Sequence, residues 1–195
     1  SMLGKKGGLI YFLYTEFSKL GYKISFALFN SANYGVPQKR ERILFFGTRG
    51  EKAITLPRPT HNEFGESKLK PWISIKDAFT GLDNQKNDFV EFREKHLKYL
   101  SKLDAGQYWR HLSEKDQKDA MGGSYKLQGG KTGFFRRLHW DKPAPTLVTS
   151  PVMPATMLCH PEELRPLSVQ EYARIQQFPD YWKFSGSVMR QYKQI

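Results

Sequence analysis

Residues 33–47, NYGVPQKRERILFFG, join a turn, a group of charges and an apolar run in one short stretch. The turn contains Gly and Pro, Lys39, Arg40 and Arg42 surround one acid, and residues 43–46 are all apolar. A short apolar run bounded by turn residues indicates a buried strand. Cations this close to the start of a strand are either solvated or bind an anionic or polar ligand.

The residues before this stretch predict a helix and a strand. Residues 8–20 place apolar side chains at the spacing of an amphipathic helix that packs on a sheet, and Gly21 ends it. Residues 22–30 are typical of a strand, so together with residues 42–47 they predict an edge hairpin. A helix and two strands bury too little surface to stand alone, and residues 1–50 are therefore expected to be the end of an α/β sheet.

The middle of the chain changes character twice. Pro and Gly residues among scattered charges indicate a linker or an extended crossing segment over residues 51–71. Ser74 and Asp77 have the spacing of a capping box and predict a short helix. Residues 84–119 are highly charged with interleaved aromatic side chains and are expected to be partly helical. Glycine-shaped loops around a β element are expected to follow.

The clearest local signal is the run LSVQEYARIQQFPD, residues 167–180. Ser168 with Glu171 three positions later predicts a capped helix start, and Pro179 closes the helix soon after. The core face of this helix is expected to consist of Val169, Tyr172, Ala173 and Ile175. This pattern predicts structure, and function must come from elsewhere.

The composition favours a folded protein with a polyanionic partner. The chain has 195 residues, of which 39% are hydrophobic and 14% aromatic, and no apolar run is long enough to span a membrane. Its 31 Lys and Arg residues against 19 Asp and Glu give a net charge of +12 and a pI near 9.7. Nucleic acid is the common partner of such a field, although ribosomal and merely soluble basic proteins share it.

The start of the chain and its single cysteine bear on the compartment. The initial Ser-Met reads as a cloning remnant and not as a signal peptide, so nothing points to secretion. The single cysteine, Cys159, excludes an intramolecular disulfide and a cysteine-based zinc cluster, which suits a reducing cytosol. A neighbouring histidine could lower the pKa of Cys159, but we expect the thiol to pack in the core. The histidines are too scattered for a metal site.

Three stretches together carry a family resemblance. VPQKRER, residues 36–42, contains Gln-x-Arg-x-Arg; RRLHWDKPAPTL spans residues 136–147; and RPLSVQEYARIQQFPDYWKFSGS, residues 165–187, is followed by QYKQI. In this order and spacing they resemble the carboxy-terminal half of DNA (cytosine-5) methyltransferases of the bacterial restriction-modification type.

The resemblance implies an α/β fold in two parts. Residues 1–50 would be the terminal helix and edge β-hairpin of a Rossmann-like, S-adenosylmethionine-dependent methyltransferase sheet, followed by a linker over residues 51–71. Residues 72–165 would form a smaller, mixed target-recognition domain, and residues 166–195 would return to the catalytic domain.

The resemblance also implies that the chain is a fragment. The family's cofactor-binding glycine motif, its Pro-Cys nucleophile and its Glu-Asn-Val motif are not present, and the sequence stops at Ile195, where Gly-Asn-Ala-Val-Pro would follow. We therefore expect a chain that is inactive alone and that acts with an amino-terminal half from the same protein or from a separate subunit. S-adenosylmethionine would bind mainly outside this chain, in a bacterial cytoplasmic enzyme without membrane contact.

In the family reaction a cytosine is flipped out of the duplex, a cysteine thiolate attacks carbon 6, and carbon 5 takes the methyl group. Donors at N3 and O2 must stabilise the charge that builds on the ring, and arginine suits this task. The motif assigns the O2 contact to Arg42, places Arg40 beside it to grip the backbone or order the loop, and gives Gln38 a hydrogen bond to the flipped nucleotide or to the loop. Alternatively, the arginines form surface ion pairs with Glu41 or with other acids nearby.

The second stretch implies contacts to double-stranded DNA. In the family a threonine at the position of Thr146 contacts a phosphate beside the flipped base. Such a contact positions the duplex without recognising its base sequence. Arg137 could reach a guanine edge, clamp a phosphate or be plain surface charge. Arg136 and Lys142 are further candidates. Gly122, Gly123, Gly129, Gly130 and Gly133 would let recognition loops approach DNA, or are ordinary turns. Two alternatives remain open: a non-enzymatic DNA-binding module and an RNA-directed relative.

Overall fold

The computed structural model of the chain describes residues 8–82, 88–127 and 132–195. Its helices are α1 (Leu9–Lys19), α2 (Ile75–Phe79), α3 (Glu94–Leu100), α4 (Glu114–Met121), α5 (Val169–Ile175) and α6 (Val188–Gln194). Its strands are β1 (Lys23–Asn30), β2 (Gln38–Lys39), β3 (Glu41–Thr48), β4 (His61–Asn62), β5 (Lys70–Pro71) and β6 (Ala144–Pro145). Short 3-10 helices are Ser31–Tyr34, Trp109–His111, Gly122–Lys126 and Pro154–Thr156. Gly129 and Gly130, expected in turns, lie outside the described residues.

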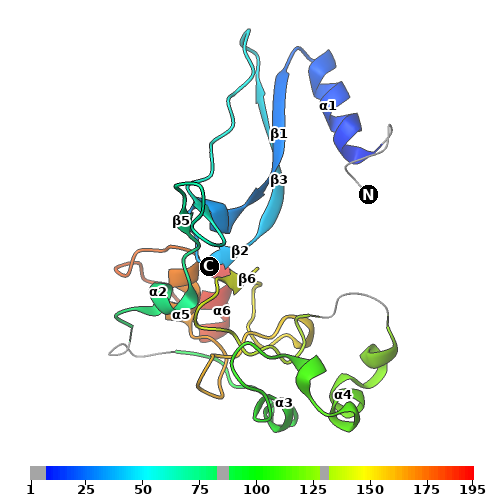
Figure 1. Ribbon diagram of the computed structural model, residues 1–195, viewed down its shortest axis with the longest axis vertical. Helices are drawn as coiled ribbons and strands as arrows, with labels where there is room; N and C mark the ends of the chain where they lie inside the picture. Colours follow the sequence, from blue (N-terminus) through cyan, green and yellow to red (C-terminus); the bar gives the residue numbers. More distant parts are fainter. Residues whose placement is uncertain (1–7, 83–87, 128–131) are drawn as a thin grey trace.

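A long hairpin arm forms one end of the molecule, and the helices after α1 gather at the other end (Figure 1). Strands β1 and β3 pair antiparallel along their whole length, from Lys23 opposite Thr48 to Asn30 opposite Glu41. Helix α1 lies beside β1, and Gly21 ends the turn after it in the left-handed region, with a φ of +83°. The predicted helix and hairpin are confirmed.

The apolar side chains of this arm are largely uncovered. Ile10 is the buried residue of α1, on a helix predicted to pack on a sheet. The exposed large apolar side chains of α1, the residue after it and the hairpin are Leu9, Tyr11, Phe12, Tyr14, Phe17, Leu20, Phe26, Leu28 and Leu44. The arm therefore has no core of its own, as a helix with two strands leads one to expect.

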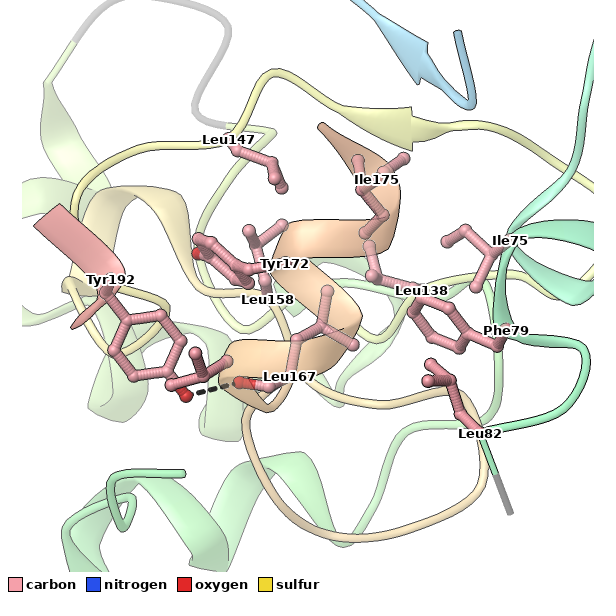
Figure 2. Close-up of a cluster of buried hydrophobic side chains, with 12 residues drawn as sticks. Ile75, Phe79, Leu82, Leu138, Leu147, Leu158, Leu167, Tyr172, Ile175 and Tyr192 are labelled. Carbon is pink, nitrogen blue, oxygen red and sulfur yellow. Dashed lines mark hydrogen bonds between the residues drawn. The ribbon is translucent and has the colours of Figure 1, made fainter. Parts of the chain in front are cut away.

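The main core lies where α2, α5 and α6 meet the chain around Leu138, Leu147 and Leu158 (Figure 2). The centre of α5 enters it with Tyr172, and α6 contributes Tyr192, whose hydroxyl donates to the carbonyl of Leu167 over 2.6 Å. This core draws side chains from both sides of the boundary expected at residue 165. The return segment therefore packs directly on the preceding part of the chain.

A second core holds α3 and α4 together with the chain around Phe135. Its buried members include Trp109, Met157 and Cys159. The charged stretch predicted to be partly helical is thus folded around aromatic side chains, and its charges lie at the surface.

Both predicted helix starts have complete capping boxes. The Ser74 hydroxyl accepts from the backbone N–H of Asp77 over 3.1 Å, and the Asp77 carboxylate accepts from the Ser74 N–H over 3.0 Å. Ser168 and Glu171 make the same pair of bonds at the start of α5, over 3.1 and 2.7 Å. These bonds satisfy N–H groups that a helix start leaves open, so the capping-box predictions are confirmed.

The stretch expected as a linker contains a small ordered loop. Strands β4 and β5 pair parallel, with His61 opposite Lys70. The loop is attached to the turn before β2 through Asn33, whose backbone carbonyl accepts from the Thr60 N–H over 2.9 Å. The side-chain oxygen of Asn33 accepts from the indole N–H of Trp72 over 2.8 Å. This loop supports the turn from one side.

Candidate nucleic-acid interface

The two stretches expected to touch DNA lie side by side. Strands β2 and β6 form a parallel ladder in which Gln38 is opposite Ala144 and Lys39 is opposite Pro145. The Thr146 hydroxyl donates to the Lys39 carbonyl over 3.2 Å, across 107 positions of sequence. Figure 1 places β2 and β6 at the foot of the hairpin arm, between the arm and the helices.

The turn before β2 is fixed by a glycine and by several hydrogen bonds. Gly35 has a φ of +83°, and a Cβ added there would lie 2.9 Å from the ring of His61. The Ser31 hydroxyl donates to the Gln38 carbonyl over 2.6 Å, and the Asn30 side chain accepts from the Ala32 N–H over 3.2 Å. The backbone that carries Arg40 and Arg42 is therefore held in place without any ligand.

Gln38 is buried, and both ends of its amide are used inside the chain. Its nitrogen donates to the side-chain oxygen of Gln176 over 3.1 Å, and its oxygen accepts from the Leu147 N–H over 3.2 Å. Only 1% of Gln38 is exposed. The side chain thus connects β2, the chain after β6 and the end of α5. Of the two expected hydrogen bonds of Gln38, to the flipped nucleotide or to the loop, this geometry agrees with the one that orders the loop. Gln176 was not among the predicted residues, because no local pattern marks it as a partner of Gln38.

Arg40 and Arg42 line a pocket of about 380 Å³ whose lining is almost entirely apolar, so they border it with their aliphatic stems. Its other lining residues come from the hairpin, the turn and the chain beyond, and all but Ser31 and Tyr34 are apolar: Phe29, Ser31, Tyr34, Val36, Leu44, Phe46 and Pro57. The Arg42 guanidinium donates to the backbone carbonyl of Glu41 over 2.7 Å. Among the described residues, no carboxylate lies within ion-pair distance of either arginine, so the alternative of a pair with Glu41 does not describe this geometry.

Lys39 points to the other side of the short strand. It is exposed, and its ammonium lies 5.3 Å from the ring centroid of Trp72. This cation–π contact leaves Arg40 and Arg42 as the cations of the motif at the pocket.

Arg137 is used inside the chain and not at the β2–β6 ladder. Its guanidinium donates to the backbone carbonyls of Leu103, Pro161 and Glu162 over 2.8, 3.0 and 2.6 Å. Its Nε is buried and has no partner among the described residues. A guanidinium that joins three carbonyls in this way is not free to reach a base edge.

Arg136 and Lys142 have different surroundings. Arg136 donates through Nε to the Thr132 carbonyl over 2.9 Å, and burial lowers the pKa of its guanidinium. The Lys142 side chain is exposed two positions before β6, while its backbone carbonyl accepts from the Ile75 N–H over 3.0 Å. Lys142 therefore lies at the surface close to the ladder.

Cys159 is buried, and burial is the main cause that raises the pKa of its thiol to about 11. The neighbouring His160 is also buried, and burial lowers its pKa, so it supplies no positive charge to stabilise a thiolate. The expected packing role of Cys159 agrees with this geometry. Over residues 8–82, 88–127 and 132–195, no group of three or more His, Cys, Asp and Glu side chains could hold a metal ion. Nor does any described helix have the length and apolarity to cross a membrane.

The sequence matches a family model over almost its whole length. The model, described as C-5 cytosine-specific DNA methylase, covers residues 4–195. The type II methyltransferase M.Sau96I of Staphylococcus aureus is 41% identical over 179 residues, which are 92% of this chain and 40% of that protein. M.Eco47II of Escherichia coli is 41% identical over 83% of this chain and 39% of its own length, and M.PspPI of Psychrobacter sp. is 40% identical over 90% and 42%. The chain thus spans about two fifths of the length of these curated relatives.

A solved structure supports the fold. A crystal structure described as a DNA modification methyltransferase encoded within a prophage of E. coli superposes with a TM-score of 0.51 at 19% sequence identity. It covers 99% of this chain and 61% of the other. The mixed helix and strand architecture is thus that of a methyltransferase fold.

Proposed function

The chain belongs to the C-5 cytosine-specific DNA methylase family, and from this we propose that it is the DNA-recognising, carboxy-terminal part of a bacterial type II DNA (cytosine-5) methyltransferase. Its relatives are enzymes of restriction-modification systems, and it spans about two fifths of their length. The net charge of +12 suits a duplex as the partner.

The observation that carries this proposal is the β2–β6 ladder. It brings the Gln-x-Arg-x-Arg motif, through Gln38 and Lys39, next to Thr146, although the two stretches are far apart in sequence. A nucleotide that leaves the duplex would meet both together: its base at the arginines and its phosphate at the threonine. A hydroxyl at a phosphate positions the strand, and a guanidinium can stabilise charge on a base.

The residues in and around the ladder then have separate tasks. Arg42 is exposed at the pocket and would donate to O2 of the flipped cytosine, where negative charge builds during attack. Gln38 is a positioning residue, because its buried amide fixes the turn that carries Arg40 and Arg42. Thr146 would turn its hydroxyl from the Lys39 carbonyl to a phosphate. Lys142, exposed nearby, would add a phosphate contact, whereas Arg136 and Arg137 support the fold.

The pocket at the arginines does not fit S-adenosylmethionine. Its lining consists of two arginines, one serine, one tyrosine and apolar side chains, with no carboxylate to receive ribose hydroxyls or an ammonium group. As the resemblance implies, the methyl donor would be bound by the amino-terminal part of the enzyme, which would also supply the nucleophile. Cys159, buried and with a raised pKa, is unsuited to that task.

The uncovered apolar side chains of α1 and the hairpin also support an enzyme made of this chain and an amino-terminal part. Contiguous exposed apolar surface marks an interaction site in a folded protein. We propose that the amino-terminal part, in the same protein or in a separate subunit, covers this arm and completes a bacterial cytoplasmic enzyme.

Complementation tests the proposal. The chain is mixed with the amino-terminal part of a relative such as M.Sau96I, and transfer of labelled methyl from S-adenosylmethionine to duplex DNA is measured. We expect transfer by the mixture, a loss of about 100-fold for Arg42→Ala, and little change for the control Arg49→Ala, whose guanidinium stacks on Tyr22. Full-rate transfer by Arg42→Ala would contradict the role of that arginine.

Two further outcomes separate the alternatives. Methylation by this chain alone would overturn the need for a partner. Salt-sensitive duplex binding without methylation by any complemented mixture would favour a non-enzymatic DNA-binding module. Competition between duplex DNA and transfer RNA decides which polymer is preferred.

A further inference from the structure

Two glutamine side chains at the end of α5 contact the turn before β2. The Gln176 oxygen accepts from the Gln38 amide, and the Gln177 amide nitrogen donates to the Gly35 carbonyl over 2.8 Å, across 142 positions of sequence. Gly35 is buried, so its carbonyl needs a partner inside the protein, and Gln177 supplies one. The turn is thus held at two points, Gly35 and Gln38, which fixes its orientation as well as its position.

The backbone of Gln177 has a conformation that favours glycine. Its φ is +60°, in the left-handed region. The Phe178 N–H donates to the Ala173 carbonyl over 2.9 Å, and the Gln177 N–H donates to the Arg174 carbonyl over 3.0 Å. These two bonds form a Schellman motif, in which the left-handed residue after the helix is usually glycine. A side chain at a position where glycine is less strained indicates that the side chain itself is used.

The same end of α5 is attached to α2. The Arg174 guanidinium donates to the carbonyls of Ala78 and Thr80 over 3.2 and 3.1 Å, and it pairs with Asp180. Because α2 and α5 both belong to the main core, Gln177 reaches the turn from a part of the chain that is fixed by packing. A contact that positions a functional group needs such a rigid base.

We propose that Gln177 is a positioning residue for methyl transfer, which holds the Gly35 carbonyl and thereby sets the direction in which the following chain presents Arg40 and Arg42. The inference rests on the proposed function for the reaction that it serves. Gln177 acts through the backbone of the turn and not by contact with DNA, so its loss changes the rate of transfer and not the affinity for the duplex. Glycine would fit the backbone at this position better but has no amide to donate.

Gln177→Gly separates this role from a contribution to stability, because it removes the amide and relieves the backbone at the same position. In the mixture with the amino-terminal part, at saturating DNA, we expect kcat to fall between about 10- and 100-fold with an unchanged KM for DNA. The urea midpoint should stay near that of wild type, since relief of the backbone offsets the lost hydrogen bond. An unchanged kcat overturns the proposal, as does a fall in kcat that only follows the fraction of folded chain.

Ser67→Gly is the matched control. Ser67, in the loop between β4 and β5, also has a positive φ, of +56°, so glycine relieves the backbone there while the contacts of Gln177 stay intact. This variant should keep the kcat of wild type. An equal loss of kcat in Ser67→Gly would show that the effect does not come from the Gln177 amide and would overturn the proposal.

A pair of longer substitutions tests whether the donor itself matters. A lysine ammonium can donate to the Gly35 carbonyl, whereas methionine has a similar length and no donor. Gln177→Lys should therefore recover most of the kcat that Gln177→Met loses. Equal rates for the two variants would contradict a role for the hydrogen bond.

The isolated chain separates this inference from the proposed function. In the ¹⁵N-labelled chain, Gln177→Gly should shift the backbone amide signals of Val36 and Gln38, and Ser67→Gly should not; unmoved signals overturn the inference. Shifted signals without methylation by any mixture would sink the proposed function, while the contact between Gln177 and the turn would stand. Methylation at full kcat by Gln177→Gly would leave the proposed function standing and overturn the inference.

Discussion

Arg42 and Arg137 carry the same guanidinium in very different surroundings. Arg42 has a single bond to a backbone carbonyl and borders a pocket, whereas Arg137 connects three carbonyls from separate parts of the chain. The motif around each arginine predicted a cation at that position. It did not predict which cation would be used internally, because the carbonyls that accept from Arg137 lie 24 to 34 positions away.

Replacing Arg137 is expected to affect stability more than DNA binding. Arg137→Met removes three charge-assisted hydrogen bonds and should lower the free energy of unfolding by about 3 kcal/mol. Arg136→Met, which removes one such bond, should cost about 1 kcal/mol. Urea unfolding measures both. If Arg137→Met kept its stability and relaxed the sequence preference for DNA, the guanidinium would be a base reader after all.

The thiol of Cys159 is expected to be unreactive in the folded chain. With a pKa of about 11, only ~0.1% of it is thiolate at pH 8, and the side chain is also inaccessible. Alkylation by iodoacetamide, followed by mass spectrometry, should therefore be slow until urea unfolds the protein. Rapid alkylation under native conditions would show an accessible, activated cysteine and reopen its role.

At the scale of elements, the sequence predicted the helices and strands that have local signals. It did not predict the strand pairs that depend on tertiary contacts. The capping residues of α2 and α5, the spacing in α1 and the apolar run of β3 are all visible in sequence. The parallel pairs β2–β6 and β4–β5 are not visible, because each involves two residues a side and depends on packing elsewhere. The candidate site was thus predicted as residues, while its assembly around Gln38 and Gln176 was not.

The two capping boxes provide a comparison between elements. Ser74→Ala should lower the free energy of unfolding by about 1 kcal/mol. Ser168→Ala should cost more, about 2 kcal/mol, because Ser168 is buried and its partner Glu171 also binds the buried Arg165 over 2.9 Å. Chemical denaturation of the two variants checks the order. Equal losses would mean that the Arg165–Glu171 pair does not depend on the cap.

At the scale of the whole molecule, a basic chain packs two cores at one end and leaves an apolar arm at the other. The cores explain why residues after 72 fold together. Most of the large apolar side chains that are exposed on this chain belong to the arm. The sequence of the arm predicted its apolar side chains but not their exposure, because burial depends on what faces them.

The exposed arm should cause the isolated chain to self-associate. Phe12 of α1 and Leu20, the residue after this helix, are 56% and 66% exposed, so Phe12→Glu with Leu20→Glu should shift the chain toward monomer. Sedimentation velocity at several concentrations measures the change. The complementing amino-terminal part should have the same effect on the wild-type chain. If the chain self-associates equally with the two substitutions and with the amino-terminal part, the interface between its copies lies outside the arm.

Acidification should destabilise the fold through His160. Burial is the main cause that lowers the pKa of His160 below its ordinary value of 6.5, against the opposing charges of Glu171, Glu163 and Glu162. The unfolded chain therefore takes up a proton more readily, and the stability contributed above pH 6.5 is lost as the pH falls below it. The neutral ring nitrogen accepts from two backbone N–H groups, those of Glu162 and Glu163, which protonation would break.

His160→Asn tests this directly, because its amide oxygen can replace the accepting nitrogen without titrating. The variant should lose less stability than wild type between pH 6.5 and 5, measured by urea unfolding. If acidification instead raised the stability of wild type, an ion pair between protonated His160 and Glu171 would dominate.

The bond between Gln38 and Leu147 has a consequence for how the protein is made. It joins positions 109 residues apart, so the chain between them must fold back before Leu147 can support the turn at β2. On the ribosome, the hairpin that carries Arg42 and the local bonds of the turn can form first, and the buried support of Gln38 by Leu147 and Gln176 follows later. If the proposed function holds, the positive charge that attracts DNA is made before the contacts that support the arginines. The support beneath the motif is complete only once the core that includes Leu147 has folded.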